Sequence, residues 1–190
     1  MIFQKRNFPI IVLCLLISFF SCKKDTKFKK EVFIRDNNFV GILKVEWLDK
    51  PRLYKISIQN KQTGKSDRIY IPFEIFDLQT GDINGDGSID FCLGLIKPTP
   101  HDPTMKKRLF IFKIDRDYIR PLWLGSRLWH TYEQFRVIES KPTCLVRSIE
   151  VTGSQSYMVN EYSWKSFGLS WIRSKGDSLS LNQATKLLLE

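Results

Sequence analysis

The sequence predicts an all-β domain of antiparallel meanders, either a propeller-like stack or a sandwich, followed by one C-terminal helix. Three observations lead to this fold class. Apolar and polar residues alternate along most of the chain after residue 36, the connecting segments are short, and one helical pattern occurs near the C-terminus.

About ten short strands account for the alternating pattern. In residues 43–47 and 54–58, every second residue is apolar, which is typical of half-buried strands, and Asp49-Lys50-Pro51 supplies a turn between them. Further strands are predicted at Ile69 to Phe76, Phe91 to Ile96, Arg108 to Ile114, Ile119 to Leu124, Phe135 to Glu139, Cys144 to Val151, Tyr157 to Trp164 and Phe167 to Arg173.

Residues 97–107 have no apolar periodicity and contain three prolines, so we expect a surface loop there. The helix is predicted after Ser180, which can cap it while Gln183 reaches back in a capping box. Its apolar face combines Leu181, Ala184, Leu187 and Leu188. This helix should pack on a sheet edge or face.

The N-terminus has the layout of an export signal. Lys5 and Arg6 precede an uncharged stretch, residues 8–20, which is followed by Ser21 and Cys22. The stretch is shorter than the ~20 residues that a helix needs to span a bilayer. A cleaved signal over residues 1–21 is therefore favoured over a permanent transmembrane anchor.

Ser21 and Cys22 resemble the end of a bacterial lipoprotein signal, and the segment Ser21-Cys22-Lys23-Lys24-Asp25 is similar to the lipoprotein start common in Bacteroidota. The resemblance implies that Cys22 becomes the diacylated first residue of the mature protein. Two acyl chains suffice for stable membrane anchoring. The location would then be the cell envelope, on the periplasmic or surface face of the outer membrane. The alternative is an ordinary secretory signal in which Cys22 has no role.

Behind Cys22 we expect a basic tether over residues 22–36 and a single domain over residues 37–190. Loss of Lys5 and Arg6 with the signal lowers the formal charge from +10 to +8. The basic residues are dispersed and an exported chain rarely meets nucleic acid, so we expect no nucleic-acid partner. Membrane headgroups or an anionic glycan fit the charge better.

Two cysteines remain in the domain, Cys92 and Cys144, because Cys14 leaves with the signal and Cys22 is acylated. An oxidising compartment permits a disulfide between them. Both lie in apolar, strand-like runs, where free cysteines are also commonly buried. We predict free thiols.

One segment carries clear metal-binding chemistry. Oxygen side chains alternate at Asp82, Asn84 and Asp86, Gly87 permits a sharp turn, and Asp90 adds a last carboxylate. With the carbonyl of Ser88, these groups can surround a hard cation such as Ca²⁺. An EF-hand is excluded, because its twelfth position is Leu93 here and the following residues are strand-like. A plain Asn-Gly/Asp-Gly turn is the alternative.

The nine residues 82–90 resemble the D-x-N-x-D-G-x-x-D calcium loops of the FG-GAP or integrin-α type, in which the loop leads into a strand of a propeller blade. The resemblance implies one Ca²⁺ site. Such loops recur once per blade in that family, whereas this chain contains one.

The sequence offers little for catalysis. His101 and His130 are the only histidines, and Asp115 and Asp117 fit a hairpin turn better than a catalytic pair. We therefore favour a non-catalytic, calcium-stabilised module that binds an envelope protein or a glycan or has a structural role. Aromatic side chains for such binding are offered by Trp123, Trp129, Tyr132, Tyr157 and Tyr162. The alternative is a calcium-dependent hydrolase acting on an anionic envelope or extracellular polymer.

Overall fold

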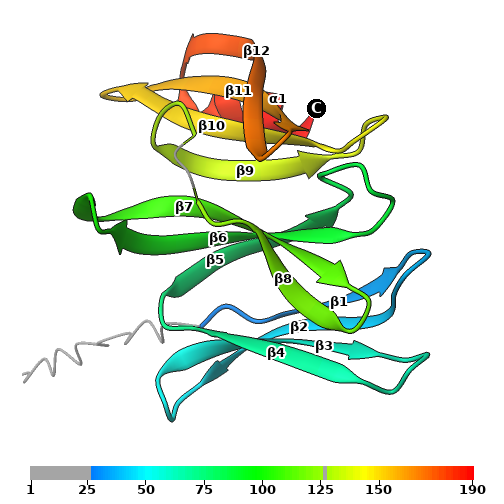
Figure 1. The fold of residues 1–190 in the computed structure, drawn as a ribbon. Helices are drawn as coiled ribbons and strands as arrows, with labels where there is room; N and C mark the ends of the chain where they lie inside the picture. The colour runs from blue at the N-terminus through cyan, green and yellow to red at the C-terminus, as the bar shows by residue number, and fades with distance from the viewer. Residues whose placement is uncertain (1–26, 126–127) are drawn as a thin grey trace, which may run out of the picture.

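Three four-stranded antiparallel sheets are stacked face to face in the computed structural model, which describes residues 27–125 and 128–190 (Figure 1). Sheet A contains β1 (Lys30–Arg35), β2 (Val40–Leu48), β3 (Leu53–Asn60) and β4 (Ser66–Ile71). Sheet B contains β5 (Glu74–Gly81), β6 (Asp90–Thr99), β7 (Asp102–Asp115) and β8 (Tyr118–Trp123). Sheet C contains β9 (Tyr132–Ile138), β10 (Leu145–Gly153), β11 (Ser156–Lys165) and β12 (Gly168–Leu179).

Each sheet is a meander, because consecutive strands pair in chain order. One helix, α1 (Leu181–Leu189), packs against the outer face of sheet C. The predicted all-β fold with one C-terminal helix is confirmed. The described residues form a stack of three sheets, where a sandwich would have two.

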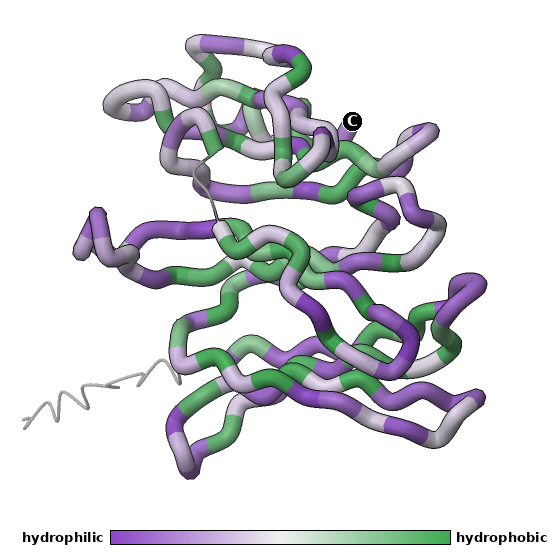
Figure 2. The backbone as a smooth tube through the Cα atoms, viewed as in Figure 1, coloured by the Kyte–Doolittle hydropathy of each residue, from purple (hydrophilic) through white to green (hydrophobic). Residues whose placement is uncertain are grey.

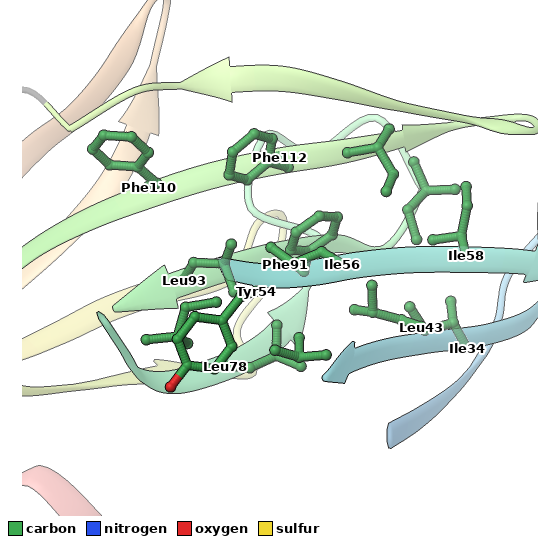
Figure 3. Close-up of a cluster of buried hydrophobic side chains, with 14 of the residues drawn as sticks. Ile34, Leu43, Tyr54, Ile56, Ile58, Leu78, Phe91, Leu93, Phe110 and Phe112 are labelled. Atoms are coloured by element: carbon green, nitrogen blue, oxygen red, sulfur yellow. The ribbon is translucent and has the colours of Figure 1, made fainter. Parts of the chain in front are cut away.

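Sheet A buries one face, and its sequence alternates accordingly. Ile56 and Ile58 of β3 are fully buried between sheets A and B, whereas Lys55 and Ser57 point away from sheet B. The core that they join also contains Leu43, Tyr54, Leu78, Phe91 and Phe112 (Figure 3).

Sheet B is buried on both faces, which explains the unbroken apolar run at the start of β6. Phe91 and Leu93 pack toward sheet A, while Cys92 between them packs toward sheet C. The rings of Phe91 and Phe112 stack at 5.2 Å between centroids. Hydrophobic residues are accordingly concentrated along the strands, and hydrophilic ones at the hairpin turns (Figure 2).

The helix begins where the sequence predicts. Ser180 and Gln183 form the capping box, with the Ser180 side chain accepting from the backbone of Gln183. Ala184 and Leu188 pack on the outer face of sheet C, while Leu181 is 41% exposed. The helix therefore covers sheet C through the C-terminal part of its predicted apolar face.

Three local predictions are wrong. The strand expected at 69–76 is two strands in different sheets, because Pro72 separates β4, which pairs with β3, from β5, which pairs with β6. The surface loop expected at 97–107 is mostly strand. β6 continues to Thr99 and β7 begins at Asp102, and Pro98 is tolerated at a register shift between Lys97 and Thr99.

The third correction concerns the tether expected at 22–36. Its residues 30–35 form β1, which pairs along its whole length with β2. Phe28 also packs against the core between sheets A and B. The ordered domain therefore starts earlier than residue 37.

Both cysteines of the domain are buried free thiols in the core between sheets B and C, as the sequence predicts. Burial raises the pKa of each thiol above its ordinary value, and that of Cys92 well above it. The protonated form of each thiol is therefore favoured at neutral pH, so neither is activated as a nucleophile.

Candidate metal centre

The predicted calcium loop is the connection between β5 and β6 of the middle sheet. Gly81 ends β5 and pairs with Asp90, the first residue of β6, so residues 82–89 project from the end of this hairpin. Gly85 and Gly87 have positive φ angles of 77° and 80°, which L side chains rarely adopt. The two glycines thus allow the tight turns that bring the polar side chains close together.

Hydrogen bonds within the loop hold its first side chains. Asp82 accepts from the backbone N–H of Gly85 at 2.8 Å and of Gly87 at 3.0 Å. Asp86 accepts from the side chain of Asn84 at 3.0 Å and from the backbone of Ser88 at 2.9 Å. Burial opposes ionisation of Asp86, but these bonds outweigh it and hold the pKa of Asp86 below its ordinary value. Asp86 is therefore a carboxylate at neutral pH.

Asp90 has the least satisfied carboxyl group of the loop. It is fully buried, and its Oδ2 accepts from the backbone N–H of Ile83 at 3.0 Å and of Asn84 at 3.3 Å. Its Oδ1 is buried without any hydrogen-bond partner. Burial is the main cause that raises the pKa of Asp90 to about 7, and the charges of Asp86 and Asp82 add to it. A proton, a cation or a hydrogen-bond donor at Oδ1 would stabilise this carboxyl group.

A second buried carboxylate provides a contrast. Glu150 of β10 is also fully buried, but it accepts from the hydroxyls of Ser148 and Tyr162, both at 2.6 Å, and from the backbone N–H of His130 at 2.8 Å. Both of its oxygens are satisfied by protein donors, so it fits a structural role. In Asp90, by contrast, protein donors reach only Oδ2, and Oδ1 has none.

The loop also contacts the two neighbouring sheets. Asp36, in the turn between β1 and β2, accepts from the backbone N–H of Ile89 at 2.8 Å, and Asn38 donates to the Ser88 hydroxyl at 2.7 Å. On the other side, the backbone N–H of Cys144 donates to the carbonyl of Asp82 at 2.8 Å. One loop of sheet B is thus bonded to both sheet A and sheet C.

All five residues of the predicted site, Asp82, Asn84, Asp86, Ser88 and Asp90, therefore lie in one hairpin connection. Among the described residues, however, no three His, Cys, Asp or Glu side chains are gathered closely enough to form a metal-holding group. The carboxylates of Asp82 and Asp86 still have spare lone pairs, since each oxygen can accept more than one bond. Carboxylate and carbonyl oxygens are the ligands that a hard cation prefers, and among these carboxyl groups Asp90 has the buried oxygen without a protein partner.

Sequence reasoning missed Asp36 and Asn38, which bond to the loop from another sheet. The polar triplet Asp36-Asn37-Asn38 is a turn signal, but its position next to the Lys-rich segment placed Asp36 in the expected tether. Only the pairing of β1 with β2 and the stacking of sheet A on sheet B bring the triplet to the loop.

A small hollow of about 250 Å³ lies beside the loop and is lined by Asn38, Asp86, Ser88, Lys113, Ile114, Asp115 and Arg116. Its volume is below the ~300–1,000 Å³ typical of small-molecule sites. Asp115 lines it, but Asp117 is held elsewhere, by Thr63 at 2.7 Å and Asn60 at 2.9 Å. The two carboxylates are therefore not arranged as a catalytic pair, and their place at the β7–β8 turn is the predicted one.

The aromatic side chains expected to bind a partner are mostly buried. Trp123, Tyr132 and Tyr162 are under 10% exposed and belong to the core between sheets B and C. Trp129 is 57% exposed and forms a T-shaped pair with Trp171 of β12, with ring centroids 5.5 Å apart. This pair is an exposed aromatic surface at the edge between β12 and the connection that precedes β9, and the sequence had pointed to only Trp129.

The predicted signal segment and Cys22 lie outside the described residues. In the part of the chain that the structure describes, none of the helical structure has the length and hydrophobicity needed to cross a bilayer. Comparison of the chain with protein-family models, with curated proteins and with solved structures gives no match in any of the three.

Proposed function

We propose that this protein is a membrane-anchored lipoprotein of the cell envelope, whose three-sheet domain is a non-catalytic binding or structural module stabilised by one Ca²⁺. The observation that carries the proposal is the orphaned, buried Oδ1 of Asp90 in a loop that also presents Asp82 and Asp86. A bound cation would satisfy this oxygen and offset the repulsion among three carboxyl groups.

The position of the loop explains what the ion would do. Because residues 82–90 bond to Asp36 on one side and Cys144 on the other, fixing the loop also fixes the contacts among all three sheets. A bound calcium ion would thus stabilise the contacts among the three sheets, a role that we call the calcium clamp. No observation at the loop favours hydrolysis of an anionic polymer, since Asp115 and Asp117 do not converge.

The binding surface that fits such a module best is the exposed pair Trp129 and Trp171. Large aromatic rings provide contact area at low entropic cost and stack on sugar rings or peptide side chains. The proposed partner is therefore a protein or glycan of the envelope, and the membrane is engaged separately through Cys22.

The metal assignment is tested by titrating Ca²⁺ into the chelator-treated mature protein in a calorimeter. We expect a single site with a dissociation constant in the range of about 10⁻⁴ to 10⁻³ M that is typical of extracellular modules. Asp90→Asn should abolish the binding heat, whereas Asp115→Asn, a matched change beside the loop, should leave it unchanged. Absence of binding by the unmutated protein, or an equal loss in both variants, would contradict the assignment.

A further inference from the structure

The two ends of the sheet stack differ. At one end α1 covers sheet C, whereas at the other end no element covers the outer face of sheet A among the described residues (Figure 1). Phe33 of β1 and Tyr70 of β4 point outward there and are 57% and 48% exposed. An uncovered sheet face that carries large apolar side chains needs an explanation.

The charge of this face is mainly positive. Its outward-pointing strand positions carry four basic side chains, Arg35, Lys44, Lys55 and Arg68, and two acidic ones, Glu31 and Glu46. Lys61 of the β3–β4 turn adds a fifth basic side chain. Glu46 pairs with Lys44 at 2.6 Å and with Lys55 at 3.1 Å. Within the described chain, Arg35, Lys61 and Arg68 form no ion pair, and Lys61 lies 5.3 Å above the ring of Phe33.

The chain enters the domain at this same sheet. Phe28 is anchored in the core, and its backbone N–H donates to the Tyr54 hydroxyl at 3.3 Å. Between Cys22 and Phe28 lie five residues, so the connection spans at most about 20 Å even when fully extended. This step rests on the proposed lipid anchor: an acylated Cys22 would hold sheet A, and not sheet C, next to the headgroups.

We propose that the outer face of sheet A docks onto the anionic headgroup layer of the membrane that holds the anchor. Exposed aromatic rings flanked by basic side chains suit the boundary between acyl chains and anionic headgroups. A second copy of the chain fits the face poorly, because face-to-face packing would oppose the unpaired cations Arg35, Lys61 and Arg68. Docking places sheet C, beside which Trp129 and Trp171 lie, at the end of the stack far from the membrane.

The test is lysine acetylation of the purified mature protein in phosphatidylcholine vesicles made with or without phosphatidylglycerol, with modified residues read by mass spectrometry. At low salt, acetylation of Lys55 and Lys61 should slow severalfold only when phosphatidylglycerol is present, and high salt should remove the protection. Lys165 and Lys186, which lie at the opposite end on β11 and α1, should react equally in both vesicles. Equal reaction of Lys55 and Lys61 in the two vesicles would overturn the proposal.

A variant pair separates this face from the anchor. Lys61→Glu/Arg68→Glu should lose the protection of Lys55, whereas Lys165→Glu/Lys186→Glu should keep it. If the mature protein carries no lipid, the anchor proposal fails, and the face is then tested alone by flotation with phosphatidylglycerol vesicles. Flotation that Lys61→Glu/Arg68→Glu abolishes would support the face, and absence of flotation would refute it.

Discussion

The carboxylate of Asp36 accepts a hydrogen bond from the backbone N–H of Ile89 at 2.8 Å, although the two residues are 53 positions apart in the chain. The same carboxylate caps its own turn by accepting from the backbone of Asn38 at 2.7 Å and of Phe39 at 2.8 Å. One side chain therefore joins the first turn of sheet A to the loop of sheet B.

This bond predicts the effect of Asp36→Asn. The amide can still accept at its one oxygen, but its NH₂ group then faces an N–H donor, so the partly buried N–H of Ile89 loses its acceptor. We expect the free energy of unfolding in urea to fall by about 1–3 kcal/mol. Asn37→Ala, a change at the exposed neighbour, should alter it by no more than about 0.5 kcal/mol. Equal effects of the two changes would show that the bond to Ile89 does not stabilise the stack.

A buried ion pair joins sheet C to the helix. Glu161 is 1% exposed and accepts from Arg147 at 2.7 Å and from Arg173 at 2.7 Å, while Arg147 also donates to the carbonyls of Leu187 and Leu188 at the end of α1. Glu161→Gln leaves the charge of Arg147 buried without its carboxylate, so unfolding free energy should fall by about 3–5 kcal/mol. Glu133→Gln, which breaks the half-exposed pair with Lys107, should cost about 1 kcal/mol or less.

The same pair predicts acid sensitivity. Burial raises the pKa of Glu161, but the hydrogen bonds from Arg147 and Arg173 outweigh it, so the pKa lies below its ordinary value of 4.5. The stability that this group contributes is therefore complete above pH 4.5 and is lost as the pH falls through the lower folded pKa. Thermal melts across this range should show a shallower acid decline for Glu161→Gln than for the unmutated protein. An identical decline would exclude this pair as a source of acid sensitivity.

The thiols of Cys92 and Cys144 should both be free in the mature protein. Labelling in denaturant without reductant should count two thiols, and labelling of the folded protein should be slow because both side chains are buried. A count of zero in denaturant would show a disulfide that the structure does not contain.

The anchor is tested at Cys22. Because the Cys22 sulfur would carry the diacylglycerol, Cys22→Ala should move the protein from the detergent phase to the aqueous phase in a phase-partition assay. Intact mass of the native protein should show a chain that begins at Cys22 with added lipid mass. A different first residue, or the same residue without lipid, would refute the lipoprotein assignment.

Strands β2 and β3 of sheet A and the helix were predictable because each buries one face. In β3 the alternation of Ile56 and Ile58 with Lys55 and Ser57 is a period-two signal, and the capping box at Ser180 marks the start of α1. The placement of the candidate site residues in one loop was predictable for a different reason. Asp82 to Asp90 form one local segment, so their proximity is contained in the sequence spacing.

The missed features depend on contacts between segments far apart in the chain. The residues on both sides of Pro72 have a strand-like pattern. That pattern does not indicate that they form strands of two different sheets. β1 lies in a Lys-rich segment and becomes a strand by pairing with β2. Two further features depend on how the sheets stack: the hydrogen bond between Asp36 and the loop, and the burial of the unsatisfied Oδ1 of Asp90. The alternation of apolar and polar residues in the sequence does not indicate how sheets stack.

The most direct test of the calcium clamp is the melting temperature of the mature protein in chelator and in Ca²⁺. A tenfold excess of Ca²⁺ over the dissociation constant stabilises the folded state by about 1.4 kcal/mol. The melting temperature should therefore rise by a few degrees, since ~1 kcal/mol corresponds to about 2–4 °C in a domain of this size. Asp86→Ala should abolish this rise. Superimposable melting curves of the unmutated protein in chelator and in millimolar Ca²⁺ would show that residues 82–90 are only a turn.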